Sequence, residues 1–210
     1  MNVASPIRRR GRPPKAAAGF SETRESLVRA GVKALTEKGF SATGIDEILK
    51  SVGVPKGSFY HYFDSKEAFG TELIRRYGQY FARKLERFFT DNTLSPLERL
   101  EAFVIDAERG MERFAFTRGC LIGNLGQEMG ALPESFREQL NNVFSDWQRH
   151  TADCLRNAQA AGEVGAHHDA DRLAAFFWIG WEGAVLRAKL ERGGAALRTF
   201  AEGFFALIRR

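Results

Sequence analysis

The sequence has few cysteines and no long apolar segment. Cys120 and Cys154 are the only cysteines among 210 residues, which is too few for a disulfide framework, and no CxxC pair marks a metal site. No apolar run approaches the roughly 18 residues that span a bilayer, and none follows the positive charges near residue 1. We therefore expect a cytoplasmic protein with two reduced thiols and no metal.

The usual signatures of catalysis are also missing. The sequence has no glycine-rich phosphate loop, no paired catalytic carboxylates and no nucleophile with a neighbouring base. His167 and His168 are adjacent and His150 is isolated, so we expect all three to lie in solvent rather than on a metal. An enzyme is thus the weakest hypothesis for this chain, and no cofactor is expected.

Acidic residues are absent from residues 1–15, which hold five of the 31 basic residues. The net charge of +5 therefore lies in this segment, and the rest of the chain is balanced. We expect residues 1–19 to be a disordered basic arm that binds nucleic acid through phosphates. The run Arg10-Gly11-Arg12-Pro13 matches an AT-hook core, which would insert both arginines into an A·T minor groove. Non-specific attraction to phosphates is the alternative.

Sustained period-two alternation is absent too, so the sequence predicts an all-α fold of roughly nine helices. Ser21 is the expected cap of a first helix, which ends before Gly39. A second, short helix ends at Gly53, and Pro55 opens a third helix that reaches Phe63. Because the turn between the second and third helices is too tight for an antiparallel hairpin, the pair indicates a helix-turn-helix.

These patterns divide the chain into three parts. Residues 1–19 are the basic arm, residues 20–66 the helix-turn-helix DNA-binding domain, and residues 67–210 a helical effector-binding and dimerisation domain. Ser95 and Asp169 are expected to cap two helices of the last part. The helices expected after the helix-turn-helix are 64–88, 96–116, 120–128, 133–161, 169–192 and 195–208.

The third helix is the expected DNA reader, because the second helix of a helix-turn-helix pair enters the major groove. Lys56 and Ser58 can reach bases or phosphates there, and Gly57 allows a close approach. A helix cannot bury Tyr60, His61 and Tyr62 on one side, so at least one of them faces outward. The expected DNA contacts are Arg10, Arg12, Thr43, Lys56, Gly57, Ser58, Tyr60, His61, Tyr62 and Lys66.

Two segments of this region resemble the TetR family of bacterial repressors. They are residues 53–67, which read GVPKGSFYHYFDSKE, and residues 39–48, which read GFSATGIDEI. The resemblance implies a homodimer whose two heads bind a palindromic operator in double-stranded DNA. It also implies that the operator is released when a small ligand binds the body.

The segment 118–130 holds four glycines, a thiol and four polar or charged side chains. Each glycine costs a helix roughly 1 kcal/mol relative to alanine, so we expect this segment to line a cavity or to move. Together with residues 175–184, it resembles the AcuR-type subgroup of the TetR family and, more distantly, the NemR-type subgroup. These resemblances imply that the effector is acrylate or a related small carboxylate or electrophile.

Three roles are open for Cys120. At a helix start and close to Arg118, it can be a thiolate that an electrophile modifies, which would make the protein a redox or electrophile sensor. It can instead line the pocket of a non-covalent ligand, or be inert packing. The expected effector-binding residues are Arg118, Cys120, Asn124, Gln127, Trp147, Trp178, Trp181 and Glu182.

The family resemblance places dimerisation on the last two helices. The expected interface residues are Gly180, Gly183, Ala184, Phe200 and Phe204. The alternative is that Gly180 and Gly183 face a bulky neighbour in the same subunit. In the preferred mechanism, ligand in the body shifts the helix at 64–88, which carries the head. A rival hypothesis is an architectural DNA binder that responds to no ligand.

Overall fold

The computed structural model describes residues 16–210, with side chains from residue 19 onward. Within that range the chain forms eight α-helices, two 3-10 helices and no strand, which confirms the all-α prediction. None of these helices is both long and apolar enough to cross a membrane. They are α1 (Ala16–Lys38), α2 (Ile45–Ser51), η1 (Lys56–His61), α3 (Lys66–Phe89), α4 (Pro96–Glu112), α5 (Leu121–Gln127), η2 (Met129–Ala131), α6 (Ser135–Ala160), α7 (Ala170–Glu191) and α8 (Ala195–Ile208).

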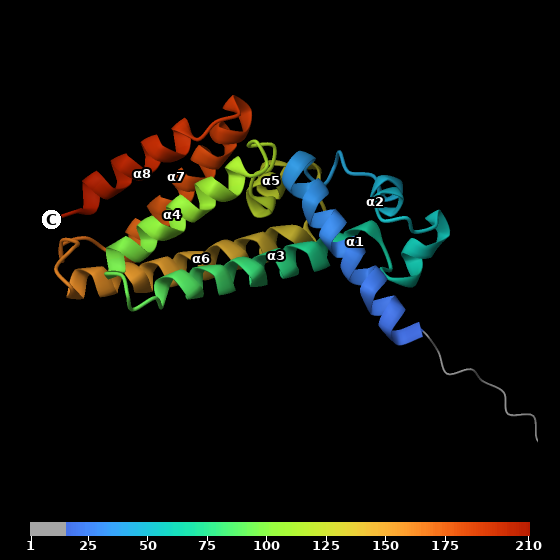
Figure 1. Cartoon of the computed structure of the whole chain (residues 1–210), viewed down its shortest axis with the longest axis horizontal. Coiled ribbons are helices and arrows are strands. Elements are labelled where there is room, and N and C mark those ends of the chain that lie inside the picture. The colour runs from blue at the N-terminus through green and yellow to red at the C-terminus, as the bar shows by residue number, and fades with distance from the viewer. Residues whose placement is uncertain (1–15) are drawn as a thin grey trace, which may run out of the picture.

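The helices form a small head at one end and a longer body (Figure 1). The head consists of α1, α2 and η1, and it closes over buried side chains such as Leu27, Leu49 and Phe59. α3 begins against the head and continues into the body, where it packs along α6. α4 and α7 pack on α6, and α8 packs on α7. A ligand site in the body can therefore reach the head through α3 or through direct contacts of α1.

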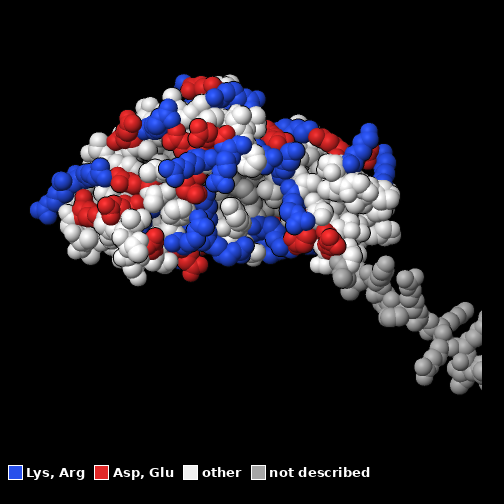
Figure 2. Space-filling model, viewed as in Figure 1, with Lys and Arg blue, Asp and Glu red and all other residues white. Residues whose placement is uncertain are grey.

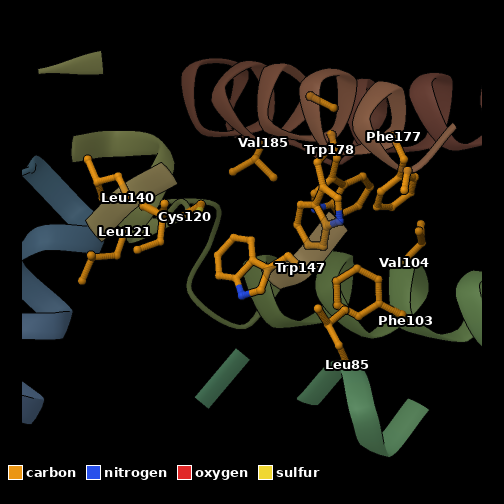
Figure 3. Packing of buried hydrophobic residues seen from close by; sticks show 14 of the residues in the cluster. Leu85, Phe103, Val104, Cys120, Leu121, Leu140, Trp147, Phe177, Trp178 and Val185 are labelled. Atoms are coloured by element: carbon orange, nitrogen blue, oxygen red, sulfur yellow. The ribbon is translucent and has the colours of Figure 1, made fainter. Parts of the chain in front are cut away.

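The core of the body is rich in aromatic rings (Figure 3). The Trp147 and Trp178 ring centroids lie 4.9 Å apart, and Phe103 lies 6.0 Å from Trp178. Both tryptophans are almost fully buried. Rings of this size remove a large apolar area from water, so this cluster fixes how α4, α6 and α7 pack together.

Both predicted cap residues of the body are confirmed. The Ser95 hydroxyl accepts a hydrogen bond from the Glu98 amide, and the Glu98 carboxylate accepts one from the Ser95 amide at 2.8 Å. The Asp169 carboxylate accepts from the amides of Asp171 and Arg172, at 2.9 and 3.1 Å. These side chains satisfy amides that the first helical turn leaves without a partner.

Two helices of the head differ from prediction. α1 begins at Ala16 and not after Ser21, because the alanines at 16–18 are strong helix formers and the single Gly19 before Ser21 does not interrupt the helix. The α-helix predicted for 55–63 is a 3-10 helix over 56–61. Short segments often take this form, and Gly57 weakens the α-helical alternative.

The helix predicted for 96–116 is also shorter than expected. It ends at Glu112, because Ala115 and Phe116 adopt φ angles of 49° and 53°. This left-handed turn reverses the chain. As a result, the segment before α5 returns towards α1 and the body closes against the head.

Candidate nucleic-acid interface and ligand cavity

One face of the head presents η1 to solvent. Lys56, Gly57, Tyr60 and His61 are all exposed there, and 66% of the Tyr60 surface is accessible. The Lys56 ammonium donates a hydrogen bond to the Asp46 carboxylate at 2.6 Å, which raises the pKa of Lys56. An exposed ammonium in this position can exchange Asp46 for a phosphate. The face is therefore accessible to DNA, and Lys56 is the cation that it could offer to a phosphate.

Thr43 and Lys66 have partners within the protein. Thr43 is only 2% exposed, and its hydroxyl donates to the Gly39 carbonyl at 2.6 Å. The Lys66 ammonium donates to the Phe40 carbonyl at 3.0 Å and lies 4.5 Å from the centre of the Phe40 ring. Partial burial lowers the pKa of Lys66. Both side chains hold the turn between α1 and α2, a role that sequence reasoning did not assign to them.

The remaining predicted DNA contacts differ in accessibility. Ser58 and Tyr62 are half-buried, and the Tyr62 ring centroid lies 4.6 Å from that of Phe20 on α1. Tyr62 therefore also fastens η1 to α1. Arg10 and Arg12 lie outside the described residues.

A cavity of about 280 Å³ lies where the head meets the body. Figure 2 shows Lys and Arg side chains gathered over the middle of this face, where α1, α3 and α4 approach one another. The predicted effector residues that line the cavity are Arg118, Cys120, Trp178, Trp181 and Glu182. The lining residues that were not predicted are Arg29, Val32, Lys33, Thr36, Tyr77, Tyr80, Phe81, Lys84, Ala107, Gly110, Met111, Phe114, Gly119 and Val185.

The missed lining residues come mostly from α1, α3 and α4. Tyr77, Phe81 and Lys84 follow one another at helical spacing on α3, and such a stripe is typical of a packed core. No sequence periodicity shows that α1 of the head forms one wall of a cavity in the body. That contact depends on the turn after α4. Its two residues with left-handed backbone angles, Ala115 and Phe116, are not glycines, so the sequence does not indicate this turn.

Three ionisable side chains meet inside this cavity. The Cys120 sulfur caps α5 by accepting a hydrogen bond from the Gly123 amide at 3.5 Å. Burial, reinforced by the nearby Glu182 charge, raises the pKa of Cys120 well above its ordinary value. Burial also raises the pKa of Glu182 to about 7, although a hydrogen bond from the Cys120 thiol opposes that shift. Tyr77 lies beside Cys120 and its pKa is raised, again mainly by burial.

Burial beside Glu182 therefore disfavours the thiolate form of Cys120, which is one of the three roles open for this residue. The amide dipole of a seven-residue helix does not compensate for burial next to a carboxylate. Nor does Arg118 supply a compensating charge to the thiol, since its guanidinium donates to the Glu37 carboxylate at 3.0 Å. The raised pKa of Cys120 favours the thiol form, whose S–H faces the Glu182 carboxylate as a donor.

Three predicted effector residues do not line the cavity. Trp147 is fully buried behind it, with its ring centroid 4.8 Å from that of Phe81. Its indole N–H has no hydrogen-bond partner among the described residues. Gln127 is exposed at the end of α5. Asn124 faces α1, where its amide donates to the carbonyls of Leu35 (2.8 Å) and Thr36 (3.1 Å).

The body caps the C-terminal end of α1. Besides the Asn124 amide, the Gly119 backbone N–H donates to the Thr36 carbonyl at 2.9 Å. The Lys189 ammonium of α7 reaches the same carbonyl at 3.4 Å. The last carbonyls of a helix have no partner within it, so these donors tie α1 to the cavity wall.

Glu128 makes a second link between the body and the head. Its carboxylate accepts hydrogen bonds from the backbone amides of Phe40 (3.0 Å) and Ser41 (2.8 Å), in the turn between α1 and α2. Gly39 adopts a φ of +80°, and a Cβ at this position would overlap the Glu128 carboxylate. The turn therefore requires glycine both for its backbone conformation and for this close approach.

The predicted dimer residues divide into inner and outer ones. Phe204 is buried within the subunit, and Gly180 faces the Phe200 ring, where a Cβ would overlap it. For Gly180 the alternative of a bulky neighbour in the same subunit is therefore correct. Gly183 is exposed, and a Cβ added there would meet no atom of the described residues within 4 Å. Ala184 lies buried next to it.

An exposed apolar stripe runs along the outside of α7. Ile179 and Leu190 are 72% and 75% exposed, and Phe176 and Leu186 are also accessible. These positions follow helical spacing, with Gly183 between them. A continuous apolar stripe on an outer helix is typical of a surface that another protein covers.

Comparison with known proteins accounts for this arrangement of head and body. The family model described as bacterial regulatory proteins, tetR family, matches residues 27–73. The model described as tetracyclin repressor-like, C-terminal domain, matches residues 96–204. The first covers the helix-turn-helix, and the second covers most of the body.

Individual proteins show the same relationship. The transcriptional regulator AcuR of Cereibacter sphaeroides is 57% identical over 93% of this chain and 89% of its own length. The transcriptional repressor NemR of Escherichia coli is 29% identical over 81% of this chain and 86% of its own. A crystal structure of a TetR regulatory protein from Rhodobacter sphaeroides superposes with a TM-score of 0.86 and 57% identity, covering 88% of this chain and 97% of its own. The chain thus belongs to the TetR family, whose members are transcriptional regulators and not enzymes.

Proposed function

We propose that this protein is a ligand-responsive repressor that binds a palindromic operator as a homodimer. A small effector, acrylate or a related small carboxylate or electrophile, occupies the cavity and releases the operator. The observation that carries this proposal is that α1, a helix of the DNA-binding head, forms one wall of a cavity in the body. A ligand there contacts both parts at once.

The route from cavity to head runs through α1 and α5. Cys120 caps α5 at the cavity, and Glu128, directly after the same helix, holds the turn between α1 and α2. Asn124 fastens the middle of α5 to α1. A displacement of α5 by a ligand therefore acts on the head directly, in addition to any shift of α3. To move the head, the ligand only has to bind the protein more tightly when the head is in one of its two positions than in the other.

The exposed face of η1 is the proposed operator-binding surface. In a dimer, two such faces would enter successive major grooves about one helical turn apart. Lys56 and Tyr60 are the side chains best placed to reach DNA, since both are exposed. The arm, residues 1–19, would add contacts through Arg10 and Arg12 in the minor groove or on phosphates.

The apolar stripe on α7 is the proposed core of the dimer interface. Ile179 and Leu190 would meet their copies across a twofold axis, because the same patch occurs on both subunits of such a dimer. Gly183, which is exposed between them, would allow the two α7 helices to approach closely. Phe200 and Phe204 would then support α7 from within each subunit.

Covalent sensing is a second candidate, favoured by the contact of Cys120 with Glu182. Glu182, with a pKa of about 7, can accept the thiol proton. The sulfur would then form a bond to the β-carbon of acrylate, and the α-carbon would take up a proton as the double bond is lost. The raised pKa of Cys120 argues that non-covalent binding comes first.

The test is operator binding measured by fluorescence anisotropy, with labelled DNA from upstream of the protein's own gene. We expect tight, sequence-selective binding that acrylate weakens. Release of both the wild type and Cys120→Ser supports non-covalent sensing, and release of the wild type alone supports the covalent route. Tight binding that acrylate leaves unchanged contradicts the proposed effector. Weak sequence preference together with no response supports the architectural alternative.

A further inference from the structure

Two basic side chains of α1, Arg29 and Lys33, line the cavity one helical turn apart. Neither forms an ion pair within the described residues, where the only side-chain hydrogen bond of Arg29 goes to the Ser26 hydroxyl at 3.2 Å. Residues 1–18, which precede the described side chains, contain no acidic residue. These two charges are therefore not neutralised by any carboxylate side chain of residues 19–210.

The other cations that line the cavity are already neutralised. The Lys84 ammonium lies 2.5 Å from the Asp106 carboxylate. The Arg118 guanidinium pairs with Glu37 at 3.0 Å and lies 3.8 Å from the centre of the Phe114 ring. The uncompensated positive charge of the cavity therefore lies on α1.

The inner wall of the cavity favours an anion less than the wall formed by α1. Trp178, Trp181 and Phe81 make much of it apolar, and Glu182 is the acidic group there. A carboxylate pointing inward would approach Glu182, whereas a carboxylate pointing towards α1 would approach the cations of Arg29 and Lys33. Charge and the apolar rings together therefore favour one orientation of an anionic ligand, with its carboxylate towards α1 and its apolar part inward.

We propose that Arg29 and Lys33 are effector-binding residues that hold the carboxylate of the ligand. This inference rests on the proposed function. It adds the orientation of the ligand and assigns two residues of the ligand site to the head. Because both residues belong to α1, the bound carboxylate bridges head and body. Removing their charge weakens the binding of an anionic ligand but not of a neutral ligand of the same shape.

The test uses Arg29→Gln, Lys33→Gln and the double variant, with Arg83→Gln as the matched control. Arg83 is also exposed and without an ion pair among the described residues, but it lies outside the cavity. Acrylate and its neutral isostere acrylamide are titrated into each full-length protein by calorimetry, without DNA. Thermal unfolding followed by circular dichroism confirms that each variant is folded.

We expect the double variant to bind acrylate about tenfold more weakly than the wild type, since charge-assisted hydrogen bonds are lost. Acrylamide affinity and the Arg83→Gln control should not change. Unchanged acrylate affinity in the double variant overturns this inference and leaves the repressor proposal intact. Absence of acrylate binding to the wild type overturns the proposed effector and this assignment together.

Discussion

The carboxylate of Glu128, directly after α5, accepts a hydrogen bond from the backbone amide of Ser41 in the turn between α1 and α2. The same carboxylate holds the Phe40 amide, so one side chain of the body fixes the turn that leads into the helix-turn-helix. Hydrogen bonds to a charged acceptor contribute about 1.5–3 kcal/mol each. This contact therefore couples the position of α5 to that of the head.

Replacing Glu128 should reduce the coupling between ligand and operator. In Glu128→Ala both amides lose their partner, and we expect the acrylate-induced loss of operator affinity to shrink at least about threefold. Acrylate affinity measured without DNA should stay within about twofold of the wild type, since Glu128 does not line the cavity. Anisotropy titrations at several acrylate concentrations measure the effect.

The control for this variant is Glu138→Ala, an exposed acid on α6 without an ion pair among the described residues. It should respond to acrylate as the wild type does. A full acrylate response in Glu128→Ala would show that α5 does not transmit the signal through this contact.

Glu182 should make the stability of the protein depend on pH. Its pKa is about 7 in the folded protein against an ordinary value of 4.5. The folded state therefore keeps a proton that the unfolded state releases. The stabilisation is complete below about pH 4.5 and is lost as the pH rises through about 7. Glu182→Gln removes this dependence. The unfolding free energy of the variant minus that of the wild type should therefore rise by up to about 3 kcal/mol between pH 4.5 and pH 8.

Urea unfolding at fixed protein concentration, at pH 4.5, 6 and 8, measures this difference. Glu138→Gln, which changes an exposed acid of α6, is the matched control. A constant difference between Glu182→Gln and the wild type would mean that Glu182 ionises normally in the cavity.

Lys56 should contribute to operator affinity through charge. Lys56→Gln removes one exposed cation from each head, and we expect operator binding to weaken about tenfold at low salt. If Lys56 contacts a phosphate, the slope of log affinity against log salt should fall by about 2 for a dimer. Asp46→Asn should have the opposite effect on affinity, since Lys56 then loses its partner within the protein.

Arg83→Gln, which changes a cation in the body, controls for net charge. Equal losses in Lys56→Gln and Arg83→Gln would indicate long-range electrostatics, and the contact assigned to η1 would then be wrong. A loss confined to some operator sequences would instead identify Lys56 as a base contact.

The stripe on α7 should control assembly. Ile179→Lys and Leu190→Lys place charges in the proposed interface, and we expect the double variant to elute as a monomer in size-exclusion chromatography with light scattering. Operator affinity should also fall in this variant, because a monomer cannot bind both half-sites of the operator at once. Ile105→Lys alters an exposed apolar residue of α4 and should leave the assembly unchanged. A dimeric double variant would place the interface elsewhere.

Local signals in the sequence predicted much of the fold. Ser95 and Asp169 have side chains suited to capping, and the structure uses both as caps. The glycine-rich segment 118–130 was expected to line a cavity or to move, and three of its residues, 118–120, line the cavity. Gly123 leaves room for the Glu182 carboxylate. Each of these features depends on a few neighbouring residues, which is why the sequence alone reveals them.

Features that depend on tertiary contacts were not predicted. Trp147 and Asn124 were expected at the ligand, but one belongs to the core and the other to the contact with α1. Helical spacing gives the direction of a side chain around its own helix and does not identify the neighbour that it meets. Arg29 and Lys33 were missed for the same reason, since nothing local indicates that α1 faces the body.

The most direct test of the account is whether acrylate and operator DNA weaken each other's binding. Acrylate affinity is measured with and without saturating operator DNA, and operator affinity with and without saturating acrylate. Thermodynamic linkage makes the two ratios equal. If ligand and DNA favour different positions of the head, each ratio should differ from one by about fivefold or more. Acrylate affinity that operator DNA leaves unchanged would contradict the claim that the cavity between α1 and the body controls DNA binding.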